Sequence, residues 1–379
     1  MYDRGGESLK RKICLVAASD MTITAFLMKH IEALSERYTI SVVANAPADL
    51  FVDSGLRVRV IPLAIQREIS PWLDLKALWQ LWWLFRYEKF DSIHSITPKA
   101  GLLSMLAARI ARLPRRVHIF TGQVWATHRG VSRLLLKTMD RLLAACATHL
   151  LADSASQRDF LVAQGVVAAG KVEVLAQGSI SGVDITRFRP NATARKGIRK
   201  DLGITEEETV FLFLGRLNRD KGVLDLAQAF STLSERCHLL FVGPDEVSMQ
   251  AEITSFVTAA SVHFIPYTDR PEQYMAAADI FCLPSYREGF GSVIIEAAAC
   301  GIPAIGSRIY GVSDAIEEGK SGLLFEAGNV DELSTCLLHL LTDEPLRRRM
   351  GEDALLRARR DFSSERVTQA WLEYYDALL

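Results

Sequence analysis

The sequence predicts an α/β protein of two Rossmann-like, doubly wound domains, and three observations lead to this prediction. Short apolar runs alternate with helical patterns along the whole chain, as they do in doubly wound parallel sheets. The chain has 379 residues, more than a single hydrophobic core usually supports. A polar stretch at residues 178–190, with the following residues 191–196, is the best candidate for a linker between the domains.

Seven strands are expected before this linker, because each is a short apolar run bounded by turn residues or helical patterns. They are residues 11–17, 39–44, 57–61, 91–95, 116–120, 149–152 and 172–175. No Gly-x-Gly-x-x-Gly follows the first strand, and no Walker P-loop occurs in the sequence. Binding of a dinucleotide or a nucleoside triphosphate by those two routes is therefore not expected.

A second parallel sheet is expected to begin near Val210. Residues 209–214, 238–242 and 279–284 are apolar runs that glycine or proline ends. Residues 347–362 and 365–379 have the charge and apolar spacing of helices. We therefore expect an N-terminal domain at 1–180, a C-terminal domain at 181–360, and a last segment, 361–379.

Two carboxylates stand eight residues apart around a predicted strand–loop–helix junction. Glu288 precedes the helix that Ser292 can begin and Gly301 can end, and Glu296 lies about one turn inside it. A helix N-terminus offers amides and a positive dipole end to a diphosphate. Glu288 can then meet a sugar and Glu296 the hydroxyls of a ribose, although a turn with two solvated glutamates has the same spacing.

A basic pair follows the predicted strand 209–214. Arg216 comes directly after Gly215, and Lys221 stands five residues later, where a helical pattern begins. Two cations at this place can clamp a diphosphate, although cations after a strand are often simply solvated. Gly243 ends a third strand, and ligands in open α/β sheets collect outside the carboxyl ends of the strands. All three segments are therefore expected at one edge of the sheet.

In this order, these segments resemble the retaining glycosyltransferases of family 4, the bacterial group that builds cell-surface polysaccharides and adopts the two-domain GT-B fold. The resemblance covers most of the chain and is strongest from about residue 175 to residue 345. Its motifs are Glu-x7-Glu at Glu288 and Glu296, Gly-Arg-Leu with Lys-Gly at 215–222, and the flanking patterns 274–279 and 301–303.

The resemblance implies two Rossmann-like domains with a cleft between them and a last helix that packs back on the first domain. It also implies that Arg216 and Lys221 hold the donor diphosphate, that Glu288 holds the sugar, and that Glu296 holds the ribose. By the same resemblance, Glu288, Arg216 and Lys221 are the catalytic candidates. The predicted donor-binding set is Gly215, Arg216, Lys221, Gly243, Glu288, Gly289, Phe290, Gly291, Ser292 and Glu296.

The expected reaction is transfer of a sugar, an N-acetylated hexosamine or deoxyhexosamine, from a UDP-linked donor to a polyprenyl-diphosphate-linked saccharide. No Asp-x-Asp occurs in the sequence, so neither a metal nor another cofactor is expected. Two alternatives stay open at this point. One is an isomerase of the same architecture that resembles the UDP-sugar 2-epimerases, and the other is a non-catalytic, membrane-associated scaffold.

The acceptor side departs from the family pattern. Many members place a histidine in a Thr-x-His-Gly turn after the strand that corresponds to 116–120, and Thr121 occupies that position here. Thr121, Gln123 and His94 are the weak acceptor-side candidates, although a histidine after a strand is more often structural. The elements around Thr121 and Lys99 resemble those of the subgroup that extends undecaprenyl-diphosphate-linked saccharides.

Two clusters in the first half are consistent with a membrane-borne acceptor. Nine cations between residues 99 and 141 are opposed only by Asp140 in that segment, and basic faces attract anionic lipid. They are Lys99, Arg109, Arg112, Arg115, Arg116, Arg129, Arg133, Lys137 and Arg141. Aromatic side chains crowd one predicted helix and suit a headgroup boundary or, alternatively, a core helix. They are Trp72, Trp79, Trp82, Trp83, Phe85 and Tyr87.

Charge and cysteine usage narrow the class of protein. The net charge is −1, and no nucleic-acid module accompanies the basic cluster, so nucleic acid is not an expected partner. The six cysteines form no Cys-x-x-Cys pair, which favours reduced, buried thiols. The first ten residues are polar and show no secretory signal. We therefore expect a cytoplasmic protein, peripherally associated with the inner face of the plasma membrane, in polysaccharide or lipopolysaccharide biosynthesis.

Overall fold

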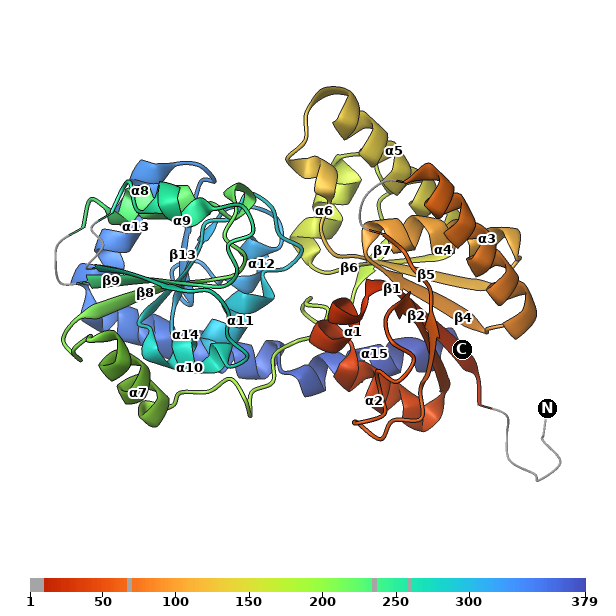
Figure 1. The fold of residues 1–379 in the computed structure, drawn as a ribbon, viewed down its shortest axis with the longest axis horizontal. Coiled ribbons are helices and arrows are strands. Elements are labelled where there is room, and N and C mark those ends of the chain that lie inside the picture. The colour runs from red at the N-terminus through yellow and green to blue at the C-terminus, as the bar shows by residue number, and fades with distance from the viewer. Residues whose placement is uncertain (1–9, 67–69, 234–236, 258–260) are drawn as a thin grey trace. The chain divides into compact units, whose positions relative to one another are not determined.

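The computed structural model describes residues 10–66, 70–233, 237–257 and 261–379. The first nine residues, which belong to the segment in which no secretory signal is found, lie outside this range. The chain divides into two compact units, Met1–Ser181 with Glu365–Leu379, and Gly182–Ser364. Each is a parallel sheet with helices on both faces, so the prediction of two Rossmann-like domains is confirmed (Figure 1). The expected borders, at 180 and 360, lie one and four residues before the observed ones.

The first unit contains a seven-stranded sheet in the order β3-β2-β1-β4-β5-β6-β7, and every neighbouring pair is parallel. All seven expected strands are present, with ends that differ by at most two residues. They are β1 Lys12–Ser19, β2 Thr39–Asn45, β3 Arg59–Pro62, β4 Ser92–Ile96, β5 Arg115–Phe120, β6 His149–Ala152 and β7 Val172–Val174. The local apolar pattern sufficed because central parallel strands are covered on both faces.

Helices cover this sheet on both faces and create two separate hydrophobic cores. One core lies under α3, α4, α5 and α6, and the other under α1, α2 and α15, as Figure 1 shows. The helices of this unit are α1 Asp20–Phe26, α2 Met28–Arg37, α3 Pro71–Glu88, α4 Pro98–Ile110, α5 Gly130–Cys146, α6 Ala155–Ala163 and α15 Ser364–Leu378, with a short 3-10 helix η1 Val124–Ala126.

The last helix, α15, belongs to the first unit although 183 residues of the second unit precede it. Its Trp371 ring stacks between two histidine rings, His30 of α2 at 4.7 Å and His94 of β4 at 4.8 Å. The Tyr375 hydroxyl lies 2.8 Å from His94 Nδ1. Through these buried contacts, α15 covers one face of the first sheet. The contacts are made by particular side chains of α15, Trp371 and Tyr375.

The second unit contains a six-stranded parallel sheet in the order β10-β9-β8-β11-β12-β13. Its strands are β8 Thr209–Leu214, β9 Cys237–Val242, β10 Val262–Ile265, β11 Ile280–Leu283, β12 Ala304–Ser307 and β13 Gly322–Phe325. The second sheet therefore begins one residue before Val210, close to the predicted place. One continuous hydrophobic core surrounds this sheet.

In Figure 1, helices α8, α9 and α13 cover one face of this sheet, and α7, α10, α11 and α14 cover the other. The helices are α7 Ala192–Leu202, α8 Val223–Phe230, α9 Met249–Ile253, α10 Pro271–Ala277, α11 Ser292–Ala299, α12 Val312–Ala315, α13 Val330–Thr342 and α14 Glu344–Asp361, with a 3-10 helix η2 Arg219–Lys221. Residues 192–196 were expected in the linker, and this was wrong. Asn191 caps α7, because its side chain accepts hydrogen bonds from the Thr193 and Ala194 amides.

All six cysteines are free, and five of them are buried. Along the part of the chain that the structure describes, we find no helix with the length and apolar character needed to cross a bilayer.

Candidate functional site

The strand order of the second sheet reverses between β8 and β11, which are neighbours at its centre. Open parallel sheets bind ligands outside the carboxyl ends of their strands at such a reversal. The turn after β8 touches the loop after β11 there, because a Cβ added to Gly222 would lie 2.0 Å from the Pro284 carbonyl oxygen. Gly222 also has a φ of 66°, so only glycine suits this position. This contact brings Lys221 beside the loop that contains Glu288.

Lys221 and Glu288 form an ion pair at this edge of the sheet, between Lys221 Nζ and Glu288 Oε1. The Ser285 hydroxyl donates a second hydrogen bond to the same carboxylate oxygen, at 2.8 Å. Both charged side chains are only partly exposed. The two residues that the sequence placed at a donor site are therefore in direct contact, although 66 residues separate them. Sequence reasoning missed Ser285, whose position three residues before Glu288 in the same loop was the available signal.

The loop between Glu288 and α11 is fixed by buried contacts. The Phe290 side chain is buried and packs edge-on against Phe362, with ring centroids 5.3 Å apart. Gly291 is the N-cap of α11, with a φ of 77°, and Ser292 is the first helical residue. Ser292 was expected to begin this helix, and the structure confirms it. A Cβ at Gly311 would lie 2.2 Å from the Gly289 carbonyl oxygen, so this loop also rests on the turn before α12.

The glycines after β8 and β9 have a structural reason for their identity. The Gly215 amide donates to the Val242 carbonyl at 2.9 Å, and a Cβ at Gly243 would lie 2.1 Å from the Gly215 carbonyl oxygen. The ends of the two strands can pack together in this way because Gly243 has no side chain. A ligand contact at Gly215 or Gly243 stays a prediction. Arg216 is largely exposed and forms a loose ion pair with Glu246, at 3.6 Å.

Glu296 lies in the middle of α11 and is partly buried. Burial raises the pKa of Glu296 to about 7, while the charge of Arg187 lowers that pKa and the charge of Glu272 raises it. Arg187 is in turn held by an ion pair with Glu272, at 3.0 Å, and by the Asp269 carbonyl. Sequence reasoning missed Arg187 and Glu272, because neither lies near Glu296 in the chain.

The acceptor-side candidates occupy different environments. His94 is fully buried, and burial lowers its pKa to about 3, so the ring is neutral and structural. This environment favours the structural interpretation of His94, and an acceptor-side role stays a prediction. Gln123 is also buried, and its carbonyl oxygen accepts a hydrogen bond from Gln157 at 3.4 Å, which makes it part of the packing. Thr121 directly follows β5 and is partly exposed.

Several cations of the basic segment are bound within the first unit and do not form a free surface. Arg109 donates to the Ala145 carbonyl and Arg116 to the Cys146 carbonyl, both at 2.7 Å, at the end of α5. Arg115 donates to the Leu378 carbonyl, at 2.6 Å, at the end of α15. Cations stabilise helix C-termini in this way. Lys99 pairs with Asp74 at 2.6 Å. Asp74 lies outside residues 99–141, so the count of opposing charges in that segment did not include it.

Helix α3 contains both buried and exposed members of the aromatic cluster. Phe85 is buried, and Trp82 packs against the core. Trp72 and Trp79 are exposed, at 83% and 58% of their surface. The core interpretation therefore holds for Phe85 and Trp82, and a headgroup contact of Trp72 and Trp79 stays a prediction.

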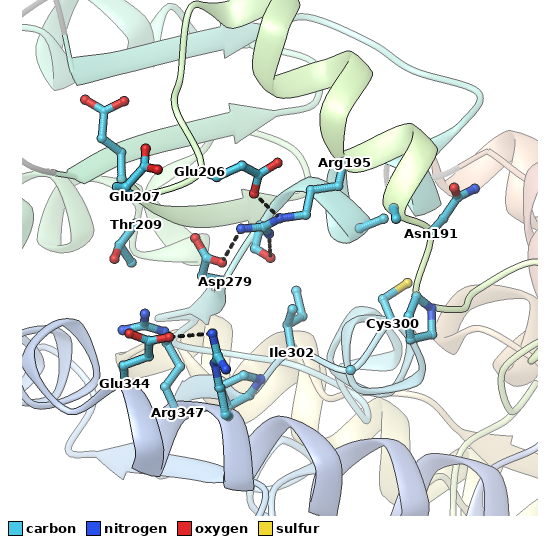
Figure 2. A pocket seen from close by; sticks show the side chains of 18 residues that line it. Asn191, Arg195, Glu206, Glu207, Thr209, Asp279, Cys300, Ile302, Glu344 and Arg347 are labelled. Carbon is cyan, nitrogen blue, oxygen red and sulfur yellow. Dashed lines mark hydrogen bonds and ion pairs between the residues drawn. The ribbon is translucent and has the colours of Figure 1, made fainter.

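A cavity of about 790 Å³ lies at the opposite edge of the second sheet, near the residues that begin β8 and precede β11 and β12. Figure 2 shows its charged side chains turned toward one another, with Arg195 paired to both Glu206 and Asp279. The predicted donor and acceptor residues all belong to the described chain, and none of them lines this cavity. Over the same described ranges, no group of three or more His, Cys, Asp or Glu side chains is placed to hold a metal ion.

Comparison with protein families matches both units. Residues 22–178 match the model described as "Glycosyl transferase 4-like domain", and residues 194–357 match the model described as "Glycosyl transferases group 1". The two matches fall on the two sheets, and the second contains every predicted donor residue.

Curated relatives span nearly the whole chain. A capsular polysaccharide biosynthesis glycosyltransferase of Staphylococcus aureus is 28% identical over 327 residues, which are 84% of this chain and 85% of that protein. An N,N'-diacetylbacillosaminyl-diphospho-undecaprenol alpha-1,3-N-acetylgalactosaminyltransferase of Campylobacter jejuni is 24% identical over 380 residues, 97% of this chain and 99% of that protein.

Among solved structures, the Anabaena protein HepE in complex with UDP superimposes with a TM-score of 0.79 at 21% identity. It covers 97% of this chain and 100% of its own. The sucrose-phosphate synthase of Thermosynechococcus elongatus superimposes with a TM-score of 0.80 at 20% identity, covering 97% and 99%. At this level of identity, the comparison establishes the fold.

Proposed function

The chain belongs to the glycosyltransferases of family 4, which have the GT-B fold, and on this premise we propose that it transfers a sugar from a UDP-linked donor to a polyprenyl-diphosphate-linked saccharide. The main structural support for the proposed donor site is the contact of Lys221 with Glu288 where the strand order reverses. The undecaprenol-linked acceptor in the name of the Campylobacter relative, and the UDP bound to the Anabaena protein, support the two substrate classes.

The donor diphosphate lies between Lys221, Arg216 and the first turn of α11 in this proposal. A departing nucleoside diphosphate carries two negative charges, and cations and amides that are already in place stabilise those charges as the bond to the sugar breaks. Neither a metal nor another cofactor has a role in this arrangement. Arg216 is exposed and can turn from Glu246 toward the diphosphate at little cost, because surface ion pairs are weak.

Glu288 holds the donor sugar, with the backbone at Phe290 and Gly291, and Glu296 holds the ribose. The ion pair and the Ser285 hydroxyl fix the Glu288 carboxylate before a ligand arrives, which lowers the cost of ordering it on binding. Transfer with retention of configuration, by attack on the face from which the diphosphate leaves, fits a site in which the leaving phosphate serves as the base. The sugar is an N-acetylated hexosamine or deoxyhexosamine.

A donor panel tests this proposal. The purified protein is incubated with UDP- and GDP-sugars and a synthetic polyprenyl-diphosphate disaccharide, and the acceptor is followed by mass spectrometry, with and without EDTA. We expect a gain of one sugar residue from a UDP-sugar, undiminished by EDTA, and an α-linked product. Complete loss in EDTA that manganese restores would contradict the metal-independent mechanism. A donor sugar isomerised without any acceptor would instead indicate an epimerase.

The acceptor's lipid chain places the reaction at a membrane. We therefore propose that the protein works in the cytoplasm, peripherally bound to the inner face of the plasma membrane, in the synthesis of a cell-surface polysaccharide.

A further inference from the structure

Two histidines of the second unit lie close together on neighbouring strands. His238 is the second residue of β9, and His263 is the second residue of β10. His263 is in register with Leu240, which lies two residues after His238, so both imidazoles project from the same face of the sheet. Their facing nitrogens, His238 Nδ1 and His263 Nε2, are 3.2 Å apart. The pair precedes the carboxyl ends of these strands and has no part in the proposed sugar transfer.

A carboxylate next to His238 favours one tautomer of its ring. His238 Nε2 is a buried atom without a close hydrogen bond among the described residues, and Oε1 of Glu208 lies 3.4 Å from it. An ionised carboxylate only accepts hydrogen bonds, so it favours the neutral ring with its proton on Nε2. That tautomer leaves a lone pair on His238 Nδ1, toward His263. Carboxylates orient metal-binding histidines in this way.

His263 is in the neutral form that a metal ion requires. Burial lowers the pKa of His263, and the charge of His238 lowers that pKa further. A neutral imidazole has a single proton, which His263 can hold on Nδ1 while Nε2 offers its lone pair to an ion. The two facing nitrogens are therefore able to act as ligands together, without release of a proton from either ring.

We propose that His238 Nδ1 and His263 Nε2 together bind one divalent transition-metal ion, zinc above all. An ion about 2.0–2.1 Å from both nitrogens would see them roughly 100° apart, near the tetrahedral arrangement that zinc adopts. Imidazole suits zinc, nickel and copper, whereas magnesium and calcium prefer oxygen ligands. Since no group of three His, Cys, Asp or Glu ligands occurs in the described chain, water completes the coordination.

The hydrogen bond between the two rings is the ion-free state of this site. Binding of the ion joins β10, the outermost strand of the sheet, to β9. The site thus has a structural role, separate from the donor site, and sugar transfer need not depend on the ion.

Calorimetric titration of the full-length chain, without a histidine tag, with zinc chloride near neutral pH tests this site. The test variant is His263→Gln, and the control is His339→Gln, at an exposed position of α13 in the same unit. We expect wild type and control to bind one equivalent of zinc with the same affinity, and His263→Gln to lose that equivalent, because one nitrogen alone remains. Glu208→Ala should weaken zinc binding by about tenfold, since the His238 ring is no longer oriented.

Equal zinc binding by His263→Gln and wild type would overturn the inference, and so would a wild type that binds no zinc. Magnesium chloride in place of zinc should give no binding, and equally tight binding of magnesium would indicate oxygen ligands elsewhere.

Amide hydrogen exchange of wild type locates the ion independently of any variant. Zinc should slow exchange in β9 and β10, and protection confined to other segments would contradict the assignment. Neither measurement requires sugar transfer. A chain that binds zinc here but transfers no sugar would therefore refute the proposed function alone, and an active chain without this zinc site would refute this inference alone.

Discussion

Lys221 and Glu288 meet across two loops of the second unit, and this pair is the most direct test of the donor site. We expect Lys221→Ala, and separately Glu288→Ala, to lower kcat/KM by about two to three powers of ten. The reason is that each removes one charge that is in place before the diphosphate departs, an effect of about 3 kcal/mol on the transition state. Initial rates of transfer measure this effect, and circular dichroism monitors the fold.

The matched control for this pair is Lys320→Ala, because Lys320 forms an ion pair with Glu317 that is much more exposed and belongs to the same unit. Its transfer rate should equal that of wild type. Activity of Lys221→Ala within twofold of wild type would remove Lys221 from the donor site.

Glu296 should make donor binding depend on pH. Burial raises the pKa of Glu296 to about 7, so the carboxyl is largely protonated at pH 6 and largely ionised at pH 8. An ionised carboxylate accepts stronger hydrogen bonds from ribose hydroxyls. We therefore expect the affinity for a UDP-sugar to rise several-fold from pH 6 to pH 8 in wild type, measured by calorimetry.

The Glu296→Gln variant is the control for this pH dependence, because an amide does not titrate. Its affinity should be lower and nearly constant over the same range. An equally steep rise in Glu296→Gln would assign the titration to another group. The raised pKa of Glu296 also affects the stability of the folded chain. Between the unfolded pKa of this group and pH 7, the folded chain retains a proton that the unfolded chain has released. The contribution of Glu296 to the free energy of unfolding therefore falls as pH rises through this range.

At the scale of elements, a buried charge network attaches α7 to the second sheet. Asp279, directly before β11, pairs with Arg195 at 2.9 Å and with Arg199 at 2.6 Å, and it accepts the Val210 amide of β8. The Arg199 side chain is almost completely buried and also donates to the Ala277 carbonyl. Figure 2 shows Asp279 and Arg195 facing each other at the wall of the cavity. One carboxylate thus joins a helix to two strands.

We expect Asp279→Asn to lower the free energy of unfolding by about 3 kcal/mol, because it leaves a buried guanidinium without its counter-charge. Urea denaturation measures this change. The control is Asp201→Asn, at an exposed position of α7. It should change the free energy of unfolding by less than about 0.5 kcal/mol. Equal stabilities of the two variants would show that the network contributes nothing net to the stability.

At the scale of the whole molecule, the two units have separate hydrophobic cores, and every predicted donor residue lies in Gly182–Ser364. A ligand that binds only the folded state stabilises it by about 2.7 kcal/mol at a hundredfold excess over Kd. We therefore expect saturating UDP to slow amide hydrogen exchange mainly in β8, β9 and β11, measured peptide by peptide.

Uridine without the diphosphate is the control for that experiment, since it lacks the groups that Lys221 and Arg216 contact in the proposed site, and it should protect much less. Protection concentrated in β1, β2 and β4 would place the nucleotide in the first unit and contradict the assignment of the donor site.

The sequence alone predicted the fold class, all strands of the first sheet and three strands of the second, β8, β9 and β11. β8 was predicted with its observed bounds, Thr209–Leu214, because a parallel strand that is buried on both faces is a continuous apolar run. Carboxyl ends of parallel strands share one edge, so the motifs at Arg216 and Glu288 could be placed together from chain order alone. These are local properties, which short segments of the sequence are enough to predict.

Contacts between distant segments were decided only by the tertiary structure. His94 is adjacent to a predicted loop in the sequence, yet Trp371 and Tyr375 of α15 bury it. Arg116 belongs to a basic run, yet its guanidinium donates to the Cys146 carbonyl at the end of α5. Burial and pairing depend on residues far away in the chain, and no local sequence pattern specifies which residues those are.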